Sequence, residues 1–274
     1  MRTHFFRARF LTGCAAVAAA LFVGACGEDD EGQPAGGGET SVDLVNEGAL
    51  TTCTHLPYEP FQFERGGEIV GFDVDLVDLV AKKLGVKQEI VDTPFEGIQS
   101  GEDLNARKCD IAAAAMTITD ERAEKIAFSD PYFDANQALL VKKGSGIKSF
   151  ADLEGKTLGV QSGTTGKMYA EENAAPAGVE LKDYEDLALE LSSVKSGQIP
   201  AAINDIPVLL DYVKKNPELE VAAQFETGEQ YGFGMKKGTS DELRAVVNEV
   251  LAQAKRDGTY DTLYEKWFGT KPPE

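Results

Sequence analysis

Residues 71–92 read GFDVDLVDLVAKKLGVKQEIVD, which predicts a helix followed by a strand. Up to Gly85 the apolar side chains recur at three- and four-residue spacings and therefore share one helical face. Three aspartates stand near its start, at positions 73, 75 and 78. Helix capping and compensation of the helix dipole explain these acids more simply than a metal site does.

The same alternation of strands and helices continues along the chain. Strand-like stretches occur at 49–54, 87–92, 109–119, 138–143, 157–161, 201–205 and 231–237, and a helical stretch closes the chain at 241–269. The stretch 109–119, CDIAAAAMTIT, is apolar throughout, as in a parallel strand that is buried on both faces. Repeated strand–helix units predict an α/β protein with parallel sheets.

The first 25 residues predict an export signal. Three arginines precede an apolar run from Phe10 to Val23, which is too short to span a membrane comfortably. The run ends in VGAC, a pattern similar to the lipobox of bacterial lipoproteins, in which Cys26 becomes the lipidated N-terminus. LTGC, ending at Cys14, is a second candidate, but almost no apolar segment precedes it, so we favour Cys26. An ordinary cleaved signal is the alternative.

Residues 26–40 are rich in glycine and acids and lack apolar periodicity, which predicts a flexible tether. The chain has a formal charge of −19, and removing residues 1–25, with three arginines and no acid, changes it to −22. A protein with this negative charge repels nucleic acid and anionic lipid headgroups. Membrane attachment would therefore depend on the lipid anchor. About 235 residues remain, enough for one large domain or two of ordinary size.

Metal chemistry has little support in the sequence. Two of the four cysteines belong to the export segment, which leaves Cys53 and Cys109 in the body. The chain has no C-x-x-C spacing, and its two histidines lie far apart. We therefore expect neither a metal nor a cofactor, whereas an exported pair of cysteines could form a disulfide.

GVQSGTTGK at 159–167 follows a predicted strand and precedes a predicted helix, an arrangement that presents backbone N–H groups to an anion. A nucleotide-binding P-loop needs Gly, four residues, then Gly-Lys-Ser/Thr. The residue five before Gly166 is Gln161, and Met168 follows Lys167, so the spacing excludes a P-loop. The loop predicts a site for another anion.

Six segments of the chain resemble family 3 of the solute-binding proteins, the extracytoplasmic amino-acid receptors of ABC importers. They are YEPFQF, GEIVGFDVDLVDLVAKKLG, AMTITDERAEKIAFSDPYF, GKTLGVQSGTTG, NDIPV and DGTYDTLYEKWFG, in the family's order from about Leu44 to Gly269. The resemblance implies a type II periplasmic-binding-protein fold, in which two α/β lobes are joined by two extended hinge strands with a ligand cleft between them. It implies lobe 1 at 41–137 and 230–274, and lobe 2 at 138–229.

The resemblance also implies which residues bind the carboxylate of a free amino acid. Arg122 matches the family position that grips the carboxylate as a bidentate fork. Thr117 matches a hydroxyl or backbone contact nearby, and Ala115 would offer only main-chain groups. Thr165 and Gly166 match positions whose backbone N–H groups meet the same carboxylate at a helix N-terminus. The anion of the glycine-rich loop is then an α-carboxylate, with phosphate as the weaker alternative.

Other matches concern the rest of the ligand. Asp205 matches the family's acid for the α-ammonium, with helix capping as its alternative role. Tyr58 matches the aromatic residue that stacks on the ligand, whereas Phe61 is expected to pack inside the lobe. Gln161 matches a position beside the ligand side chain. His55 stands where many cation-binding members carry an acid, which favours a polar uncharged or acidic amino acid over a basic one.

The function implied by the resemblance is ligand binding with lobe closure and delivery to an ABC permease, without bond chemistry. The protein would be a monomer, anchored by lipid to the outer face of the cell membrane or located in the periplasm. A ligand-sensing lipoprotein is one alternative. A dehydratase or lyase on the same scaffold is another, and it would need a general acid or base among Asp205, Glu59 and His55.

Alignment with the family also bears on the two cysteines of the body. It places Cys53 and Cys109 on neighbouring strands, about two and eight residues from the cleft end. That offset is on the order of 15–20 Å along the strands. A disulfide needs Cα atoms within about 7 Å, so we expect both cysteines to be free, buried and apolar.

Overall fold

The structure, a computed structural model, describes residues 42–273, which fall within one unit, Thr40–Glu274. The predicted signal, Cys26 and the predicted tether lie outside the described residues. A first sheet has the order β4 (Lys87–Asp92), β1 (Ala49–Thr54), β5 (Ile111–Ala112), β12 (Gly234–Lys236), β6 (Ile126–Phe128). β1 pairs in parallel with β4 and β5, whereas β12 is antiparallel to β5 and β6.

A second sheet has the order β11 (Leu219–Tyr231), β7 (Phe133–Lys142), β10 (Ala201–Asp205), β8 (Thr157–Gln161), β9 (Glu180–Tyr184). Strands β10, β8 and β9 are parallel, and β7 is antiparallel to both β10 and β11. Each sheet is therefore mixed, and the prediction of purely parallel sheets is wrong. The antiparallel strands are β12 in the first sheet and β7 in the second, and both adjoin the connections between the sheets. We call the first sheet with its helices lobe 1 and the second with its helices lobe 2.

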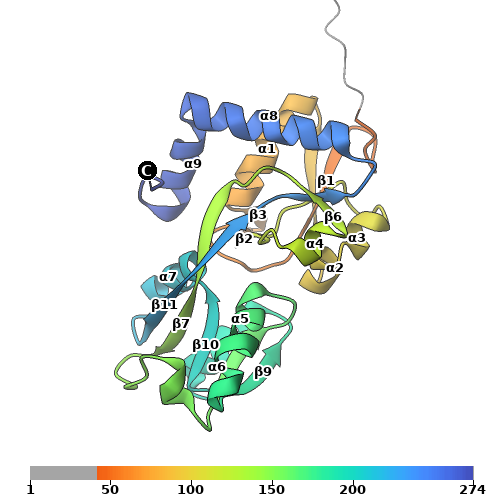
Figure 1. Ribbon diagram of the computed structural model, residues 1–274. Coiled ribbons are helices and arrows are strands. Elements are labelled where there is room, and N and C mark those ends of the chain that lie inside the picture. The colour runs from red at the N-terminus through yellow and green to blue at the C-terminus, as the bar shows by residue number, and fades with distance from the viewer. Residues whose placement is uncertain (1–41, 274) are drawn as a thin grey trace, which may run out of the picture. The chain divides into compact units, whose positions relative to one another are not determined.

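Strands β7 and β11 carry the chain between the lobes and lie side by side (Figure 1). The expected lobe boundaries, 137/138 and 229/230, fall inside these two strands. The pairing is interrupted between Phe225 and Glu229, where β11 bulges. Asn136 of β7 holds the bulge, since its side-chain oxygen accepts the backbone N–H groups of Thr227 and Gly228 at 2.8 and 3.0 Å. Because the bulge shifts the register, Glu229 lies opposite a different residue of β7 than it would in an unbroken ladder, and its side chain is re-aimed accordingly.

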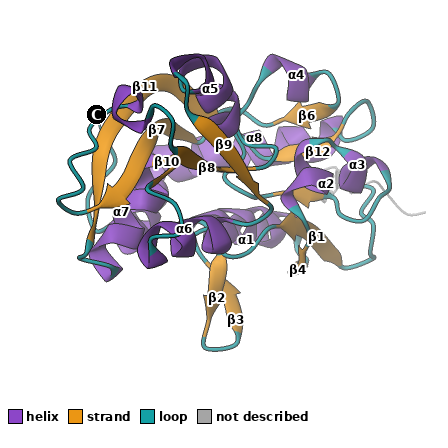
Figure 2. Ribbon diagram, turned by 90° about the horizontal axis from the view of Figure 1, so that it is seen from below, coloured by secondary structure: helices purple, strands orange, loops and turns teal. Residues whose placement is uncertain are grey.

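The helices predicted at 71–85, after the 159–167 loop and at 241–269 are present, together with others that were not predicted. Lobe 1 has α1 (Phe72–Leu84), α2 (Phe95–Gln99), α3 (Glu102–Asn105), α4 (Asp120–Ala123), α8 (Asp241–Asp257) and α9 (Thr259–Phe268). Lobe 2 has α5 (Thr165–Asn173), α6 (Leu187–Ser196), α7 (Ile206–Lys215) and two 3₁₀ turns, Phe150–Leu153 and Ala175–Ala177. A hairpin of β2 (Phe63–Arg65) and β3 (Glu68–Val70) stands apart from both sheets (Figure 2).

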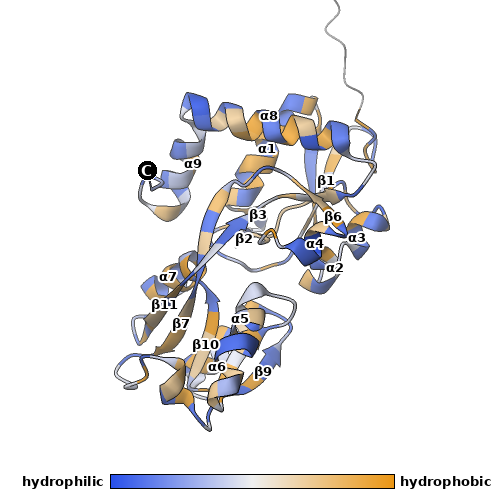
Figure 3. Cartoon of the chain, viewed as in Figure 1, coloured by the Kyte–Doolittle hydropathy of each residue, from blue (hydrophilic) through white to orange (hydrophobic). Residues whose placement is uncertain are grey.

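Most predicted elements are confirmed. The predicted helix at 71–85 is α1, whose apolar face is buried except for the half-buried Leu84 at its end. Apolar and polar residues also lie along α8 (Figure 3). The strands predicted at 49–54, 87–92, 157–161 and 201–205 are observed with those bounds. The closing helical stretch divides into α8 and α9 at Gly258, whose φ of 80° is left-handed. Among residues 42–273 no helix is long and apolar enough to cross a membrane.

The long strand predicted at 109–119 is wrong. Only Ile111 and Ala112 pair as a strand, and Ala115 adopts a left-handed conformation with φ of 47°. The reason lies in Asp73, which is fully buried and accepts the Ala115 N–H at 2.8 Å and the Tyr132 hydroxyl at 2.8 Å. The capping role expected for Asp73 is therefore wrong too, because its carboxylate fixes a loop of lobe 1.

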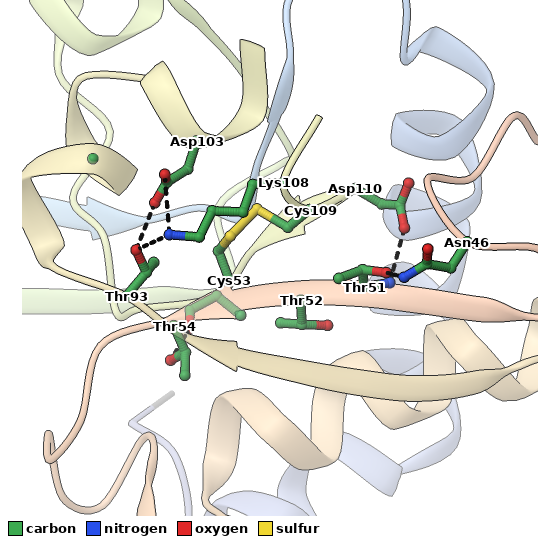
Figure 4. Close-up of a disulfide and its surroundings, with 12 residues drawn as sticks. Asn46, Thr51, Thr52, Cys53, Thr54, Thr93, Asp103, Lys108, Cys109 and Asp110 are labelled. Carbon is green, nitrogen blue, oxygen red and sulfur yellow. Dashed lines mark hydrogen bonds and ion pairs between the residues drawn. A yellow bond between two sulfur atoms is a disulfide. The ribbon is translucent and has the colours of Figure 1, made fainter. Parts of the chain in front are cut away.

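Cys53 and Cys109 form a disulfide, with their Cα atoms 5.6 Å apart (Figure 4). The expectation of two free thiols is therefore wrong. It treated every residue from Cys109 to Thr117 as extended strand, whereas β5 has two residues and Cys53 lies opposite Ala112. The chain bends at Asp110, just before β5, so Cys109 does not continue the strand and lies close to β1.

Candidate functional site

A pocket lies between lobe 1 and lobe 2, and the empty space in and in front of it, including open solvent, amounts to about 360 Å³. Its walls are His55, Tyr58, Gln62, Phe95, Ala114, Ala115, Thr117 and Arg122 from lobe 1, with Gln161, Thr164, Thr165 and Asp205 from lobe 2. Eight of the nine predicted ligand-binding residues are among them. The ninth, Gly166, lies behind the wall, where a Cβ would stand 2.8 Å from the side-chain oxygen of Gln137.

Arg122 begins on the short helix α4 and reaches into the pocket. Thr119 caps α4 by accepting the Arg122 backbone N–H, which fixes where the side chain starts. The guanidinium donates to the carbonyl oxygens of Thr117 (2.7 Å) and Gly163 (2.8 Å), one from each lobe, and lies 5.5 Å from the centre of the Phe95 ring. Only two of its five N–H donors are used in this way.

The charge of Arg122 forms no ion pair with a carboxylate of residues 42–273, although Glu229 and Asp205 act on it from farther away. The side chain is 3% exposed, its Nε lacks a hydrogen-bond partner, and no carboxylate of residues 42–273 lies within ion-pair distance. Burial lowers the pKa of Arg122 to about 10, which leaves it charged at neutral pH. A buried cation without a paired anion is costly, so this wall of the pocket favours an anion.

Asp205 lies at the opposite wall, at the end of β10. Its carboxylate accepts the Tyr58 hydroxyl at 2.6 Å, the Tyr231 hydroxyl, and the side-chain amide of Gln137. Burial and repulsion from the Glu229 carboxylate raise the pKa of Asp205 to about 6. Although Asp205 precedes α7, its side chain makes no capping hydrogen bond, which removes the alternative role.

The N-terminus of α5 closes another side of the pocket. Thr164 caps the helix, since its hydroxyl accepts the Lys167 N–H at 3.2 Å. The backbone N–H groups of Thr165 and Gly166 bond to no atom of residues 42–273 and point out of the helix end. They can therefore donate to an anion that lies in front of α5.

Ala115 lines the pocket. Its N–H is already bonded to Asp73, so the carbonyl is the main-chain group that it can offer. Burial raises the pKa of Asp73 to about 7, although the Ala115 amide and Tyr132 hydroxyl work against this rise. Asp73 thus acts behind the pocket wall and does not line it.

Three acceptor atoms at the pocket have no partner among the described residues. They are Nε2 of His55 and the side-chain oxygens of Gln62 and Gln161, all buried. The Nδ1 of His55 lies 3.0 Å from the Thr93 carbonyl oxygen, which can only accept, so Nδ1 carries the proton and donates. In the neutral imidazole Nε2 is then an acceptor that faces no donor. These atoms would suit a ligand side chain with N–H or O–H groups.

Tyr58 and Phe61 have different places. Tyr58 lines the pocket, and its hydroxyl reaches lobe 2, where its single proton can be donated either to the Asn204 side-chain oxygen (2.7 Å) or to the Asp205 carboxylate (2.6 Å). Phe61 is fully buried, 4.9 Å from Phe133 in an edge-to-face contact. The prediction that Phe61 packs inside the lobe is confirmed.

Sequence reasoning missed four polar residues at the site: Gln62, Gln137, Glu229 and Tyr231. Gln62 lies within the recognised segment YEPFQF but was given no role there. Gln137 and Glu229 stand at the two expected lobe boundaries, so they were treated as connections between lobes. Tyr231 precedes the β12 segment and gave no signal of its own. Their spatial convergence depends on the pairing of β7, β10 and β11, which the sequence does not specify.

No metal site accompanies this arrangement: residues 42–273 contain no group of three His, Cys, Asp or Glu side chains placed to hold an ion. The polar groups of the pocket instead form two opposed sets. Arg122 and the α5 N-terminus suit an anion, whereas Asp205 suits a cation. A zwitterion would satisfy both sets at once.

Comparison with known proteins agrees with this geometry. The L-cystine-binding protein TcyJ of Escherichia coli (strain K12) is 36% identical over 236 residues, which cover 84% of this chain and 87% of that protein. A solved ancestral arginine-binding protein bound to arginine is 44% identical, with a TM-score of 0.76 over 81% of this chain and 99% of that one. The ancestral amino acid-binding protein AncCDT-1, a precursor of cyclohexadienyl dehydratase, is 42% identical, with a TM-score of 0.73 over 81% and 95%.

These likenesses confirm the type II periplasmic-binding-protein fold that the sequence resemblance implied. The family model described as bacterial extracellular solute-binding proteins, family 3, matches residues 50–270, most of the chain. The chain therefore belongs to family 3 of the bacterial extracellular solute-binding proteins.

Proposed function

We propose that this protein is the amino-acid-binding receptor of an ABC importer, which closes its two lobes on a free amino acid and delivers it to a membrane permease. The observation that carries the proposal is the buried, unpaired charge of Arg122 facing the buried acid Asp205 across one pocket. An α-amino acid brings a carboxylate and an ammonium at a fixed separation, and so neutralises both walls together.

Closure follows from the way the contacts are divided. Arg122 belongs to lobe 1 but bonds to Gly163 of lobe 2, and Tyr58 of lobe 1 bonds to Asp205. A ligand held by both walls makes all its contacts only when the lobes are together, so binding shifts the population towards the closed form. We propose residues 41–137 with 230–274, and residues 138–229, as the two moving bodies.

The ligand side chain is proposed to be polar and uncharged. The sequence favoured a polar uncharged or an acidic amino acid, and the unpartnered acceptors of His55, Gln62 and Gln161 favour the first of these. A carboxylate in their midst would meet lone pairs, whereas a carboxamide would donate its N–H groups. Relatives named for cystine and arginine make those two amino acids the necessary comparisons.

We propose that no bond chemistry takes place. A dehydratase or lyase would need a general acid or base among Asp205, Glu59 and His55. We assign Asp205 to the ligand ammonium, and Glu59 is paired with Lys215. Nε2 of His55 is therefore the group at the pocket that a reaction would have to use. The likeness to a precursor of cyclohexadienyl dehydratase makes this worth testing. Amino acids recovered unchanged after long incubation with the protein, as judged by NMR, would support binding alone; a new product would overturn the proposal.

Attachment to the membrane is proposed to depend on a lipid at Cys26. Cys26→Ser should release the protein from membranes or stall its processing, whereas Cys14→Ser should do neither. Membrane fractionation with acyl labelling distinguishes the two, and loss of label in Cys14→Ser would transfer the role to that residue. The protein is proposed to act as a monomer outside the cytoplasm, as its family implies.

The function is tested by a thermal-shift screen of the unit Thr40–Glu274 against all twenty common amino acids and cystine. A ligand that binds only the folded protein raises its stability as RT ln(1 + [L]/Kd), so a ligand at 100 times its Kd adds about 2.7 kcal/mol. We expect one or two polar amino acids to raise Tm. A flat screen across all of them would contradict an amino-acid receptor.

A further inference from the structure

We propose that Glu229 is a positioning residue that turns the hydroxyl groups of Thr117 and Thr165 into acceptors for the ammonium of the ligand. The inference rests on the proposed function, because it specifies how an amino acid is recognised. Glu229 stands on β11, one of the two strands between the lobes, and its carboxylate lies between the two threonines.

The carboxylate of Glu229 is bonded by four donors. One oxygen accepts the hydroxyls of Thr117 (2.7 Å) and Thr165 (2.6 Å), and the other accepts the Gln137 amide (3.0 Å) and the Thr227 hydroxyl (2.8 Å). Thr117 belongs to lobe 1 and Thr165 to lobe 2. Glu229 therefore joins both lobes from the strand between them.

The direction of these bonds decides what the threonines offer to the pocket. An ionised carboxylate has only acceptors, so each hydroxyl must supply the proton. A hydroxyl has a single proton and two lone pairs. Because Thr117 and Thr165 donate their hydroxyl protons in hydrogen bonds to Glu229, they can offer only lone pairs to a molecule in the pocket, which both residues line. The Thr165 oxygen also has two long contacts, with the Gln137 amide nitrogen at 3.5 Å and the Thr117 hydroxyl at 3.4 Å.

Lone pairs suit an ammonium and not a carboxylate. The α-carboxylate can still be held by the guanidinium of Arg122 and by the free N–H groups at the start of α5, none of which Glu229 occupies. The ammonium would then lie among Asp205 and the two threonine oxygens. Glu229 adds a second negative charge on the same side, which is felt at Asp205 as a rise in its pKa.

Gln137 connects the two acids. Its amide donates to both Asp205 and Glu229, and its side chain is fully buried between β10 and β11. The two carboxylates are therefore held at a fixed separation on three paired strands. This rigidity is what a recognition site for one small cation requires.

The test compares amino acids with analogues that lack only the α-ammonium. L-glutamine is paired with glutaramate, and L-arginine with 5-guanidinopentanoate, and affinities are measured by calorimetry on the full chain in detergent. In Glu229→Gln the amide nitrogen replaces one acceptor, so a threonine proton turns towards the pocket. We expect affinity for the amino acid to fall about tenfold or more, while affinity for the deaminated analogue changes less than about threefold.

Two further variants separate position from charge and from damage to the strand. Glu226→Gln makes the same charge change on the same strand, at an exposed side chain that bonds to no residue among 42–273, and should leave both affinities unchanged. Glu229→Asp keeps the charge but is one methylene too short to reach both threonines, and it should lose selectivity as Glu229→Gln does.

An unchanged ratio of amino-acid to analogue affinity in Glu229→Gln would overturn the inference while the proposed function stands. Wild-type selectivity in Glu229→Asp would also overturn it, because charge alone would then explain the effect. If another amino acid raises Tm in the screen, that amino acid and its deaminated analogue replace these pairs; if no amino acid binds the wild type, the proposed function fails and this inference fails with it.

Discussion

The two walls of the pocket each depend on a buried aspartate, but in different ways. In lobe 2, Asp205 ends β10, whose five residues pair with β7 in unbroken register, and its carboxylate faces the pocket. In lobe 1, the chain leaves the sheet after Ala112, and Asp73 lies behind the wall, bonded to the Ala115 amide. Regular backbone pairing leaves Asp205 available to a ligand, whereas an irregular loop uses Asp73 to fix its own backbone.

The irregular wall also needs more support. Behind it the Cys53–Cys109 disulfide ties β1 to the approach to β5, inside an apolar cluster that includes Ile98 and Leu104. The segment 138–229 contains no cysteine. We therefore expect substitutions in lobe 1 to act on stability and binding together, and substitutions at Asp205 to act mainly on binding.

The largest expected effect is on the lobe 1 wall. Arg122→Ala removes the only cation of the pocket wall formed by the described residues and should weaken amino-acid binding by about 2–5 kcal/mol. Calorimetry on the folded variant measures it. Arg107→Ala is the matched control, because Arg107 is an exposed arginine of lobe 1 paired with Asp43. Equal affinity in both variants would take Arg122 out of the site.

The disulfide is expected to contribute nearly as much to stability. The two cysteines are separated by 56 residues in the chain, and closing a loop of that length stabilises the folded state by about 4 kcal/mol in the chain-entropy treatment. Cys53→Ser with Cys109→Ser should lower the free energy of unfolding accordingly in urea titrations. Thiol counting without reductant on the denatured unit Thr40–Glu274, whose only cysteines are Cys53 and Cys109, should find no free thiol; two free thiols would contradict the disulfide.

The sequence predicts those features that depend on neighbouring residues, and it fails for those that depend on contacts between residues far apart in the chain. The helix α1 and the strands β1, β4, β8 and β10 follow from spacing and composition, because each is decided by its own residues. Eight of nine predicted site residues line one pocket because motif matches carry positions directly.

The failures all concern distant partners. Periodicity cannot show that Asp73 will pair with Ala115, 42 residues away, so the strand predicted through Ala115 and the capping role of Asp73 were both wrong. The same loop shortened β5, and a separate bend at Asp110, before β5, brought Cys109 close to Cys53. Glu229 was missed because its place depends on a bulge in β11. In each case one long-range contact decided the local backbone.

The two aspartates can be separated by substitution. Asp73→Ala leaves the Ala115 amide and the Tyr132 hydroxyl buried without an acceptor and should lower the free energy of unfolding by about 2–3 kcal/mol. Asp205→Asn, which keeps the shape and faces the pocket, should instead weaken amino-acid binding with a smaller change in stability. Urea titration and calorimetry on both variants give the two quantities. If Asp73→Ala weakened binding more than Asp205→Asn did, and Asp205→Asn lowered stability more, the roles assigned to the two aspartates would be wrong.

The smallest effects, per unit of pH, have opposite signs for stability and for binding. Both pKa values are raised on folding, Asp73 to about 7 and Asp205 to about 6. Above pH 4 the unfolded chain has lost protons that the folded protein still holds, so each group lowers stability by about 1.4 kcal/mol per unit as pH rises, until its folded pKa is passed. The decrease in stability caused by Asp205 levels off above about pH 6, and the decrease caused by Asp73 levels off above about pH 7.

Binding should respond in the other direction, because an ammonium is held by the ionised form of Asp205. Affinity for an amino acid should rise up to about tenfold per unit as pH increases towards 6 and then level off. Calorimetry between pH 5 and 8 measures this, and urea titration over the same range measures stability. Asp205→Asn should flatten the affinity profile, whereas Asp73→Asn should flatten the stability profile between pH 6 and 7 and leave the affinity profile in place. If Asp73→Asn flattened the affinity profile instead, the acid behind the wall would be the one that senses the ligand, and the division of roles between the two lobes would be reversed.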